Sequence, residues 1–254
     1  MRRPLPRLAA ALVLLFFDKL EIMNQDVVLI LMQVLALIMA FCVHECAHAW
    51  TAWRLGDPTA KMLGRVTLNP IKHLDPFGSV LMPLVALVYH WPLLGWAKPT
   101  PVTPRNFKNY RRDDIIVTIA GPISNLLLAT AALILLLIIK HVISGGRVAV
   151  LTAMAVAMHF PVSTENLPAL FPLALLFYYI ILINLLLFVF NLVPFPPLDG
   201  SRILRHFLPY GALQVYDRMG VFALWIFMFL AGGFIFRTFL YPLQSTFDRI
   251  LAML

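Results

Sequence analysis

The stretch VHECAHAW at residues 43–50 contains the pattern H-E-x-x-H. In a helix, residues four apart lie on one face, so His44 and His48 can direct an imidazole nitrogen at the same ion. Glu45, beside the first histidine, is placed to take a proton from a water at that ion. Zinc with three protein ligands and one open position is typical of hydrolytic centres, because the metal lowers the pKa of water to about 7. The pattern therefore predicts a helix with a hydrolytic zinc site.

The segment before this pattern is apolar. Residues 27–43 are interrupted only by Gln33, so the histidines are predicted to lie on a membrane-embedded helix. Ionisable groups in such a helix are costly, which favours a functional role for them. The composition of the whole chain also indicates a membrane protein: 61% of its 254 residues are hydrophobic and 13% are charged. Soluble domains carry about 45–50% apolar and about 25% charged residues, so the composition predicts an integral membrane protein.

The net charge of +8 does not require a nucleic-acid partner, because basic loops on the cytoplasmic side of a membrane account for it. Cys42 and Cys46 are four residues apart, which suits neither a disulfide framework nor a C-x-x-C site. Cys46 lies two positions from each histidine, roughly across the helix, and is not expected to bind the metal. Both cysteines are interpreted as packing residues.

Three parts of the chain are expected. Residues 1–22 are a basic and apolar segment, interpreted as interfacial; 23–208 form the membrane core; 209–254 hold a C-terminal transmembrane helix. The fold class is predicted as an all-α polytopic membrane protein of about four to six transmembrane helices, with a short re-entrant or β-like segment after the H-E-x-x-H helix. Spans are expected at 27–53, 115–139, 167–190 and 221–236, the last continuing toward Tyr241.

Two segments lie between the first two spans. Residues 64–70, GRVTLNP, alternate like a short strand ended by a turn. Residues 77–97 carry no formal charge and are long enough to cross, although Pro83 and Pro92 interrupt them. The sequence leaves open whether this second segment crosses or re-enters the membrane.

A two-histidine zinc site needs a third ligand, and Asp199 is the candidate. It follows the proline-rich run NLVPFPPLDG at 191–200, which must end the preceding helix. Irregular backbone at membrane depth is tolerated when it is buried in protein or lines a watery cavity. The alternative is that Asp199 caps the helix that follows it.

Asn125 is the second candidate, since it follows Gly121-Pro122 near the start of the second predicted span. Its amide is a candidate donor to a scissile carbonyl oxygen. The alternative is an interhelical hydrogen bond that only stabilises the bundle. His73 could contribute from outside the ligand set, while the remaining histidines are expected to be ordinary solvated or hydrogen-bonded side chains.

Together these motifs resemble the site-2 protease family of intramembrane zinc metalloproteases. H-E-C-A-H, G-P-I-S-N and N-x-x-P-x-P-P-L-D-G occur in the family's order, and N-P-I-K-H-L-D-P at 69–76 resembles its small bacterial branch without PDZ or CBS domains. The resemblance implies that His44, His48 and Asp199 bind one zinc ion and that Glu45 is the catalytic base. It also implies that Asn125 holds the substrate or its oxyanion.

The resemblance further implies an endopeptidase that cuts a transmembrane helix of another protein in the bilayer, in regulated intramembrane proteolysis in a bacterial inner membrane. The three motifs can meet only if residues 54–112 begin and end at one membrane face. That segment carries nine Lys and Arg against two in 140–166, so the active site is expected to open toward the cytoplasm. A metal transporter would require an inverted repeat, which is not seen, and a silent scaffold would not need Glu45. The sequence does not give the oligomeric state.

Overall fold

The computed structural model describes residues 25–82, 85, 95–162 and 167–254. The predicted interfacial segment at 1–22 lies outside these residues, as does most of 77–97, so neither prediction is addressed by the structure. In the described parts the fold is helical, and its β-structure is a single antiparallel bridge between Leu74 and Ala97. The all-α prediction is confirmed.

Four helical segments of the described chain are long and apolar enough to span a membrane: Val27–Arg54, Tyr110–Val142, Phe171–Asn191 and Phe222–Met253. The shortest has 21 residues, or about 32 Å at 1.5 Å per residue, which matches a hydrocarbon core of about 30 Å. The number of spans agrees with the prediction; three of the four are longer than predicted, and Phe171–Asn191 is shorter because it begins four residues later. The last continues through Tyr241 as expected and runs to Met253.

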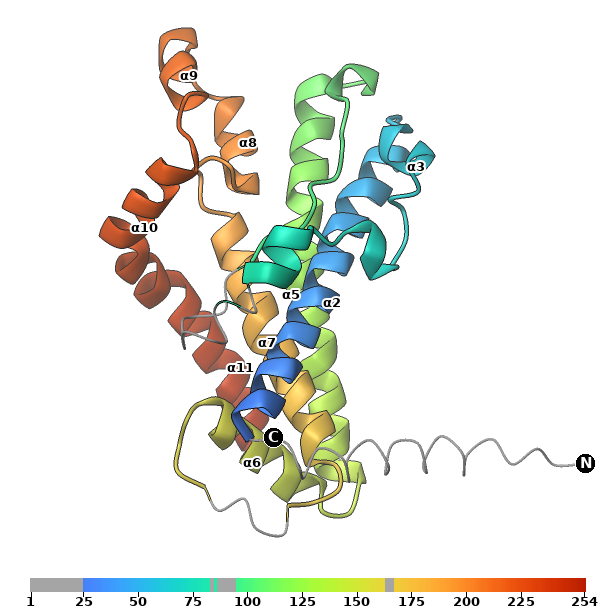
Figure 1. Cartoon of the computed structure of the whole chain (residues 1–254), viewed down its shortest axis with the longest axis vertical. Helices are drawn as coiled ribbons and strands as arrows, with labels where there is room; N and C mark the ends of the chain where they lie inside the picture. The colour runs from blue at the N-terminus through green and yellow to red at the C-terminus, as the bar shows by residue number, and fades with distance from the viewer. Residues whose placement is uncertain (1–24, 83–84, 86–94, 163–166) are drawn as a thin grey trace, which may run out of the picture.

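The helices are α2 (Gln25–Arg54), α3 (Thr59–Met62), α5 (Tyr110–Val142), α6 (Gly146–Ala157), α7 (Phe171–Asn191), α8 (Asp199–Arg205), α9 (Tyr210–Tyr216), α10 (Val221–Ile235) and α11 (Tyr241–Met253). Shorter helical turns are η1 (Pro70–Lys72), η2 (Pro76–Leu81), η3 (Pro104–Asn106) and η4 (Phe236–Leu240). Helices α2, α5 and α7 pack against one another along their lengths, and α10 continues through η4 into α11 beside them (Figure 1).

Successive long helices run in opposite directions, so α3, α8 and the first turns of α5 lie at one end of the bundle and α6 at the other (Figure 1). The segment between α2 and α5 therefore begins and ends at the same end. This is the arrangement that convergence of the three motifs requires. It also places the polar loops next to the end of α2 that carries the histidines.

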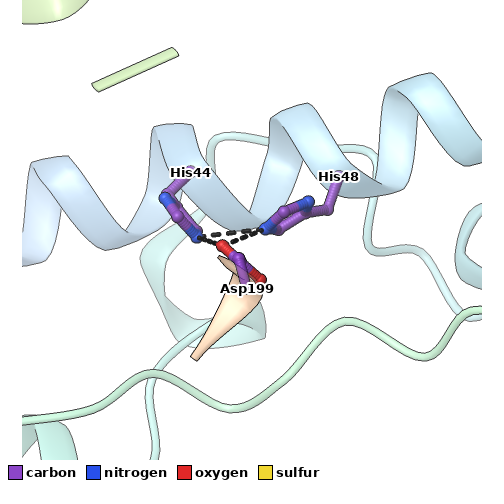
Figure 2. Close-up of side chains that lie close together, drawn as sticks. All are labelled: His44, His48 and Asp199. Atoms are coloured by element: carbon purple, nitrogen blue, oxygen red, sulfur yellow. Dashed lines mark hydrogen bonds and ion pairs between the residues drawn. The ribbon is translucent and has the colours of Figure 1, made fainter. Parts of the chain in front are cut away.

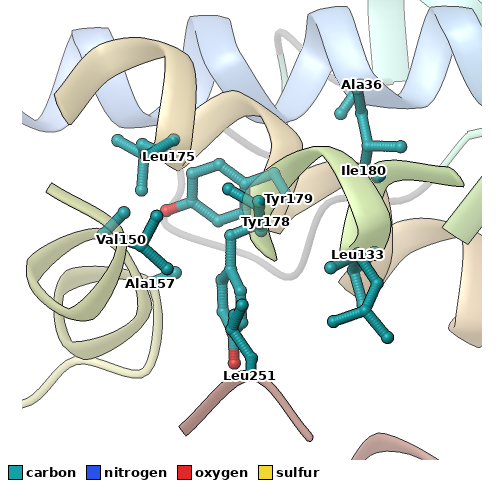
Figure 3. Close-up of a cluster of buried hydrophobic side chains, with 14 of the residues drawn as sticks. Ala36, Leu133, Val150, Ala157, Leu175, Tyr178, Tyr179, Ile180 and Leu251 are labelled. Atoms are coloured by element: carbon teal, nitrogen blue, oxygen red, sulfur yellow. The ribbon is translucent and has the colours of Figure 1, made fainter. Parts of the chain in front are cut away.

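The main core lies where α2, α5, α6, α7 and α11 meet (Figure 3). Several of its buried residues are alanines, which let helix backbones approach closely inside a bundle; they include Ala36, Ala129, Ala132, Ala149, Ala153 and Ala174. Polar contacts join α11 to this core: the Tyr178 hydroxyl donates to Asp248 at 2.8 Å, and Lys140 Nζ donates to the Leu251 carbonyl at 2.6 Å. These contacts satisfy polar groups that would otherwise be unpaired among apolar side chains.

The strand expected at residues 64–70 does not form. The Arg65 guanidinium donates to the carbonyls of Lys72, Lys98 and Pro99, so it ties separate loop segments together instead of pointing outward from a strand. The Asn69 side chain accepts from the Ile71 amide and starts η1. Short polar side chains that bond to nearby backbone compete with strand pairing, which explains the difference.

A second buried contact closes the same loop at its ends. Asp57 is fully buried and accepts from the Thr59 hydroxyl at 2.5 Å, the Thr103 amide at 2.7 Å and the Asn106 amide at 2.7 Å. Burial alone would raise the pKa of Asp57, but these hydrogen bonds hold it below its ordinary value. These hydrogen bonds fix Asp57, near the start of the loop segment between α2 and α5, to Thr103 and Asn106 near its end.

Candidate metal centre

Three side chains from two segments that are distant in the sequence converge near the end of the bundle that holds α3 and α8 (Figure 2). His44 and His48 come from consecutive turns of α2, and Asp199 is the first residue of α8. The His44 and His48 Nε2 atoms are 3.0 Å apart, and Asp199 Oδ2 lies 3.0 Å from the first and 3.2 Å from the second. The structure therefore brings together the three ligands expected from the sequence.

This triangle fits a tetrahedral ion. Nitrogen and oxygen ligands bind zinc at about 2.0–2.1 Å, so two such ligands of a tetrahedron lie about 3.3–3.4 Å apart. The observed separations of 3.0–3.2 Å need only a slight expansion to hold the ion. Two neutral imidazoles and one carboxylate are also a donor set of the kind found in hydrolytic zinc sites.

Asp199 does not act as a helix cap. The N-cap position of α8 is Leu198, and no side chain caps that end of the helix. Burial alone would raise the pKa of the Asp199 carboxyl, but hydrogen bonds from the His44 and His48 imidazoles hold it well below its usual range. These contacts favour the ionised form, which is the form that binds a metal.

Glu45 is buried beside the ligands and is held by a loop segment. Its Oε2 accepts from the Thr100 amide at 2.7 Å, and its backbone carbonyl accepts from the Thr100 hydroxyl at 3.1 Å. Pro99 and Pro101 flank Thr100 and stiffen the chain around it. Nothing in the spacing of the sequence indicated this contact, which spans 55 residues.

Helix α5 covers the other side of the histidines. The His48 Nδ1 atom lies 2.7 Å from the Val117 carbonyl oxygen, and Nδ2 of Asn125 lies 3.2 Å from Nδ1 of His44. A Cβ at Gly121 would lie 2.3 Å from His48 Nε2 and 2.7 Å from His44 Cε1. Only glycine lets α5 approach the imidazoles this closely, which is a structural reason for the G-P-I-S-N motif.

Two other histidines, His73 and His206, lie outside the ligand group. His73 is fully buried, and its Nε2 lies 2.8 Å from the Thr67 carbonyl oxygen. His206 Nε2 lies 2.8 Å from Asp114 Oδ2. The sequence did not indicate a role for Asp114, because the acidic pair Asp113-Asp114 at the start of an apolar helix has no distinctive spacing.

Comparisons with known proteins bear on this site. The model of peptidase family M50 matches residues 32–231. "Putative zinc metalloprotease YwhC" of Bacillus subtilis (strain 168) is 41% identical over 178 residues, covering 70% of this chain and 69% of that protein.

Relatives named "Putative zinc metalloprotease Rip2" also match. The protein of Mycolicibacterium smegmatis (strain ATCC 700084 / mc(2)155) is 34% identical over 96 residues, or 38% of this chain and 36% of its own length. The protein of Mycobacterium tuberculosis (strain ATCC 25618 / H37Rv) is 28% identical over 169 residues, or 66% of this chain and 54% of its own length. No solved structure matches the chain significantly.

Proposed function

The chain belongs to peptidase family M50, the site-2 protease family, and we propose that this zinc metalloprotease cuts other membrane proteins within or beside their transmembrane helices. The family resemblance and the zinc metalloendopeptidase activity expected from the sequence are confirmed by these relationships. The substrate class, regulated proteolysis and the orientation of the site belong to the proposal.

The position of the ligands carries the proposal. His44 and His48 are 6% and 5% exposed and lie inside a 28-residue apolar segment, ten and six residues before Arg54 at its end. At 1.5 Å per residue, His44 is about 15 Å below that end of the helix. A peptide bond must therefore come to membrane depth to be cut, and transmembrane segments are the peptides found there.

Each residue of the site has its own role in the reaction. When bound, zinc supplies an electrophilic centre that acidifies water and polarises a carbonyl. Glu45 takes a proton from the attacking water and delivers it to the leaving amine nitrogen. The Thr100 amide fixes the Glu45 carboxylate in place before the substrate arrives. A helical substrate must unwind locally, because its amides are otherwise bonded within the helix.

The first test uses the purified protein in lipid vesicles with a single-span reporter. We expect cleavage within or next to the span, loss of cleavage after zinc chelation, and recovery when zinc is added back. A matched reporter whose span is all leucine should be cut more slowly than one with glycines near the scissile bond, since it unwinds less readily. Cleavage products are identified by mass spectrometry. Cleavage confined to soluble unstructured proteins, with the membrane reporter left intact, would contradict the proposed substrate class.

The orientation of the site is tested by cysteine labelling in cells. Lys61, Lys108 and Arg147 are exposed, and the first two lie in the segment with nine basic residues. Cysteines at 61 and 108 should react only with a reagent admitted to the cytoplasm, whereas one at 147 should react from outside. The unsubstituted chain, with Cys42 and Cys46, gives the background. Labelling of 61 and 108 from opposite faces would mean that the site does not open toward the cytoplasm as proposed.

A further inference from the structure

Four buried residues form one stripe along α5: Asp114, Val117, Gly121 and Asn125. Their spacing of three, four and four residues places them on the same side of the helix. The stripe touches each of the two histidines: the Val117 carbonyl lies against His48, and the Asn125 amide lies against His44. Gly121, between them, keeps the stripe close to both imidazoles.

The tautomer of His44 decides what Asn125 must do. A neutral imidazole that binds a metal through Nε2 carries its proton on Nδ1 and has to donate it. The Nδ1 atom of His44 faces Nδ2 of Asn125, which is also a donor. A half-turn of the amide puts Oδ1 in the same place, where it accepts the proton. Within the described residues Oδ1 of Asn125 has no hydrogen-bond partner, so the turn breaks no other contact of that oxygen.

The burial of Asn125 opposes a direct role at the substrate. Its side chain is fully buried and its amide is directed at a ligand. A donor to the scissile carbonyl would have to face the space that the substrate enters. Contact with His44 therefore describes Asn125 better than the oxyanion role expected from the sequence.

Asp114 connects the same stripe to the third ligand. Asp114 is 5% exposed, and its carboxylate accepts from the Arg202 guanidinium at one oxygen. The other oxygen lies 2.8 Å from His206 Nε2. Arg202 lies in α8, three residues after Asp199, and His206 is the residue at which that helix ends. These two contacts thus hold the helix that begins with Asp199 against α5.

We propose that this stripe of α5 positions all three metal ligands: Val117 orients His48, Asn125 orients His44, and Asp114 holds the helix of Asp199. In the zinc-loaded protein Asn125 does so as an acceptor, through Oδ1. All three are positioning residues that act through the ligands. The inference rests on the zinc site of the proposed function and is independent of the substrate.

The test is zinc affinity, measured by competition with a chromophoric chelator on the full chain in detergent. Asn125→Asp keeps an acceptor for His44 and should bind zinc at least as tightly as wild type. Asn125→Leu has no acceptor and should bind zinc about 10–100-fold more weakly, the usual cost of losing such a partner. Asn184→Leu is the matched control, because Asn184 is equally buried but donates to Ile180 on its own helix. It should bind zinc like wild type.

The two roles for Asn125 predict opposite outcomes. An oxyanion donor would leave zinc affinity unchanged in both Asn125 variants, and that result would overturn the inference. Equal losses in Asn125→Asp and Asn125→Leu would overturn it as well, since an acceptor would then not suffice. A wild-type chain that takes up no zinc would overturn the metal site of the proposed function together with this inference.

Asp114 is tested in the same assay. Asp114→Asn removes the charge that holds Arg202 and His206 and should weaken zinc binding by up to about tenfold. The control is Asp217→Asn. Asp217 forms a solvent-exposed ion pair with Arg205, which lies in α8 like Arg202. Exposed pairs contribute little, so this variant should bind zinc like wild type. Equal affinities of the two variants would remove Asp114 from the positioning set.

Discussion

Asp199→Ala should leave a chain that neither retains zinc nor cleaves its substrate. The substitution removes the only carboxylate among the three ligand candidates and leaves two neutral imidazoles four residues apart. Zinc needs three protein ligands at a hydrolytic site, and two imidazoles on one helix do not close that set. The measurement is zinc per chain by mass spectrometry after a chelator challenge, next to turnover of the membrane reporter.

Asp199→Glu tests whether the length of the side chain matters once a carboxylate is present. The carboxylate remains but its arm is longer by one carbon, so we expect partial zinc retention with poor turnover. A helix cap would behave differently, since replacing one with alanine costs about 0.5–2 kcal/mol of stability and leaves the metal alone. Asp199→Ala that keeps zinc as firmly as wild type would place the third ligand elsewhere.

The parts of the site that the sequence predicted are those with a local signal. His44, Glu45 and His48 have a fixed helical spacing, and the prolines before Asp199 force a helix to end beside it. The order of the spans also followed from apolar length. The placement of both ends of residues 54–112 at one end of the bundle followed from the requirement that the three motifs meet, so it too could be predicted without coordinates.

The contacts that organise the ligands have no such signal. Asp114 and Arg202 are 88 residues apart, and Thr100 and Glu45 are 55 apart. Their pairing depends on how whole helices and loops pack. Arg65 is the clearest example: the alternation around it predicted a strand, but its guanidinium instead satisfies three loop carbonyls. Tertiary hydrogen bonding overrode the local pattern there.

Glu45→Gln should retain zinc at the wild-type level and lose cleavage. Both imidazoles and Asp199 are untouched, so the ligand set is complete. The glutamine oxygen can still accept from the Thr100 amide, so the side chain keeps its place against the loop. An amide cannot take a proton from the attacking water, however, and loss of a general base typically costs about 10²–10⁴ in rate. Zinc content, thermal stability and turnover are measured on the same preparation.

The hydrogen bond between the Thr100 amide and Glu45 allows a second test at the same position. Glu45→Asp keeps a base but shortens the arm that reaches Thr100, so it should also retain zinc while turning over more slowly than wild type and faster than Glu45→Gln. This order separates loss of the base from loss of its position, because only the base is missing in the glutamine variant. If Glu45→Gln cleaved at the wild-type rate, the base would have to be another group. If it lost zinc, Glu45 would be holding the ligands together, and the division of roles between Glu45 and the α5 stripe would be wrong.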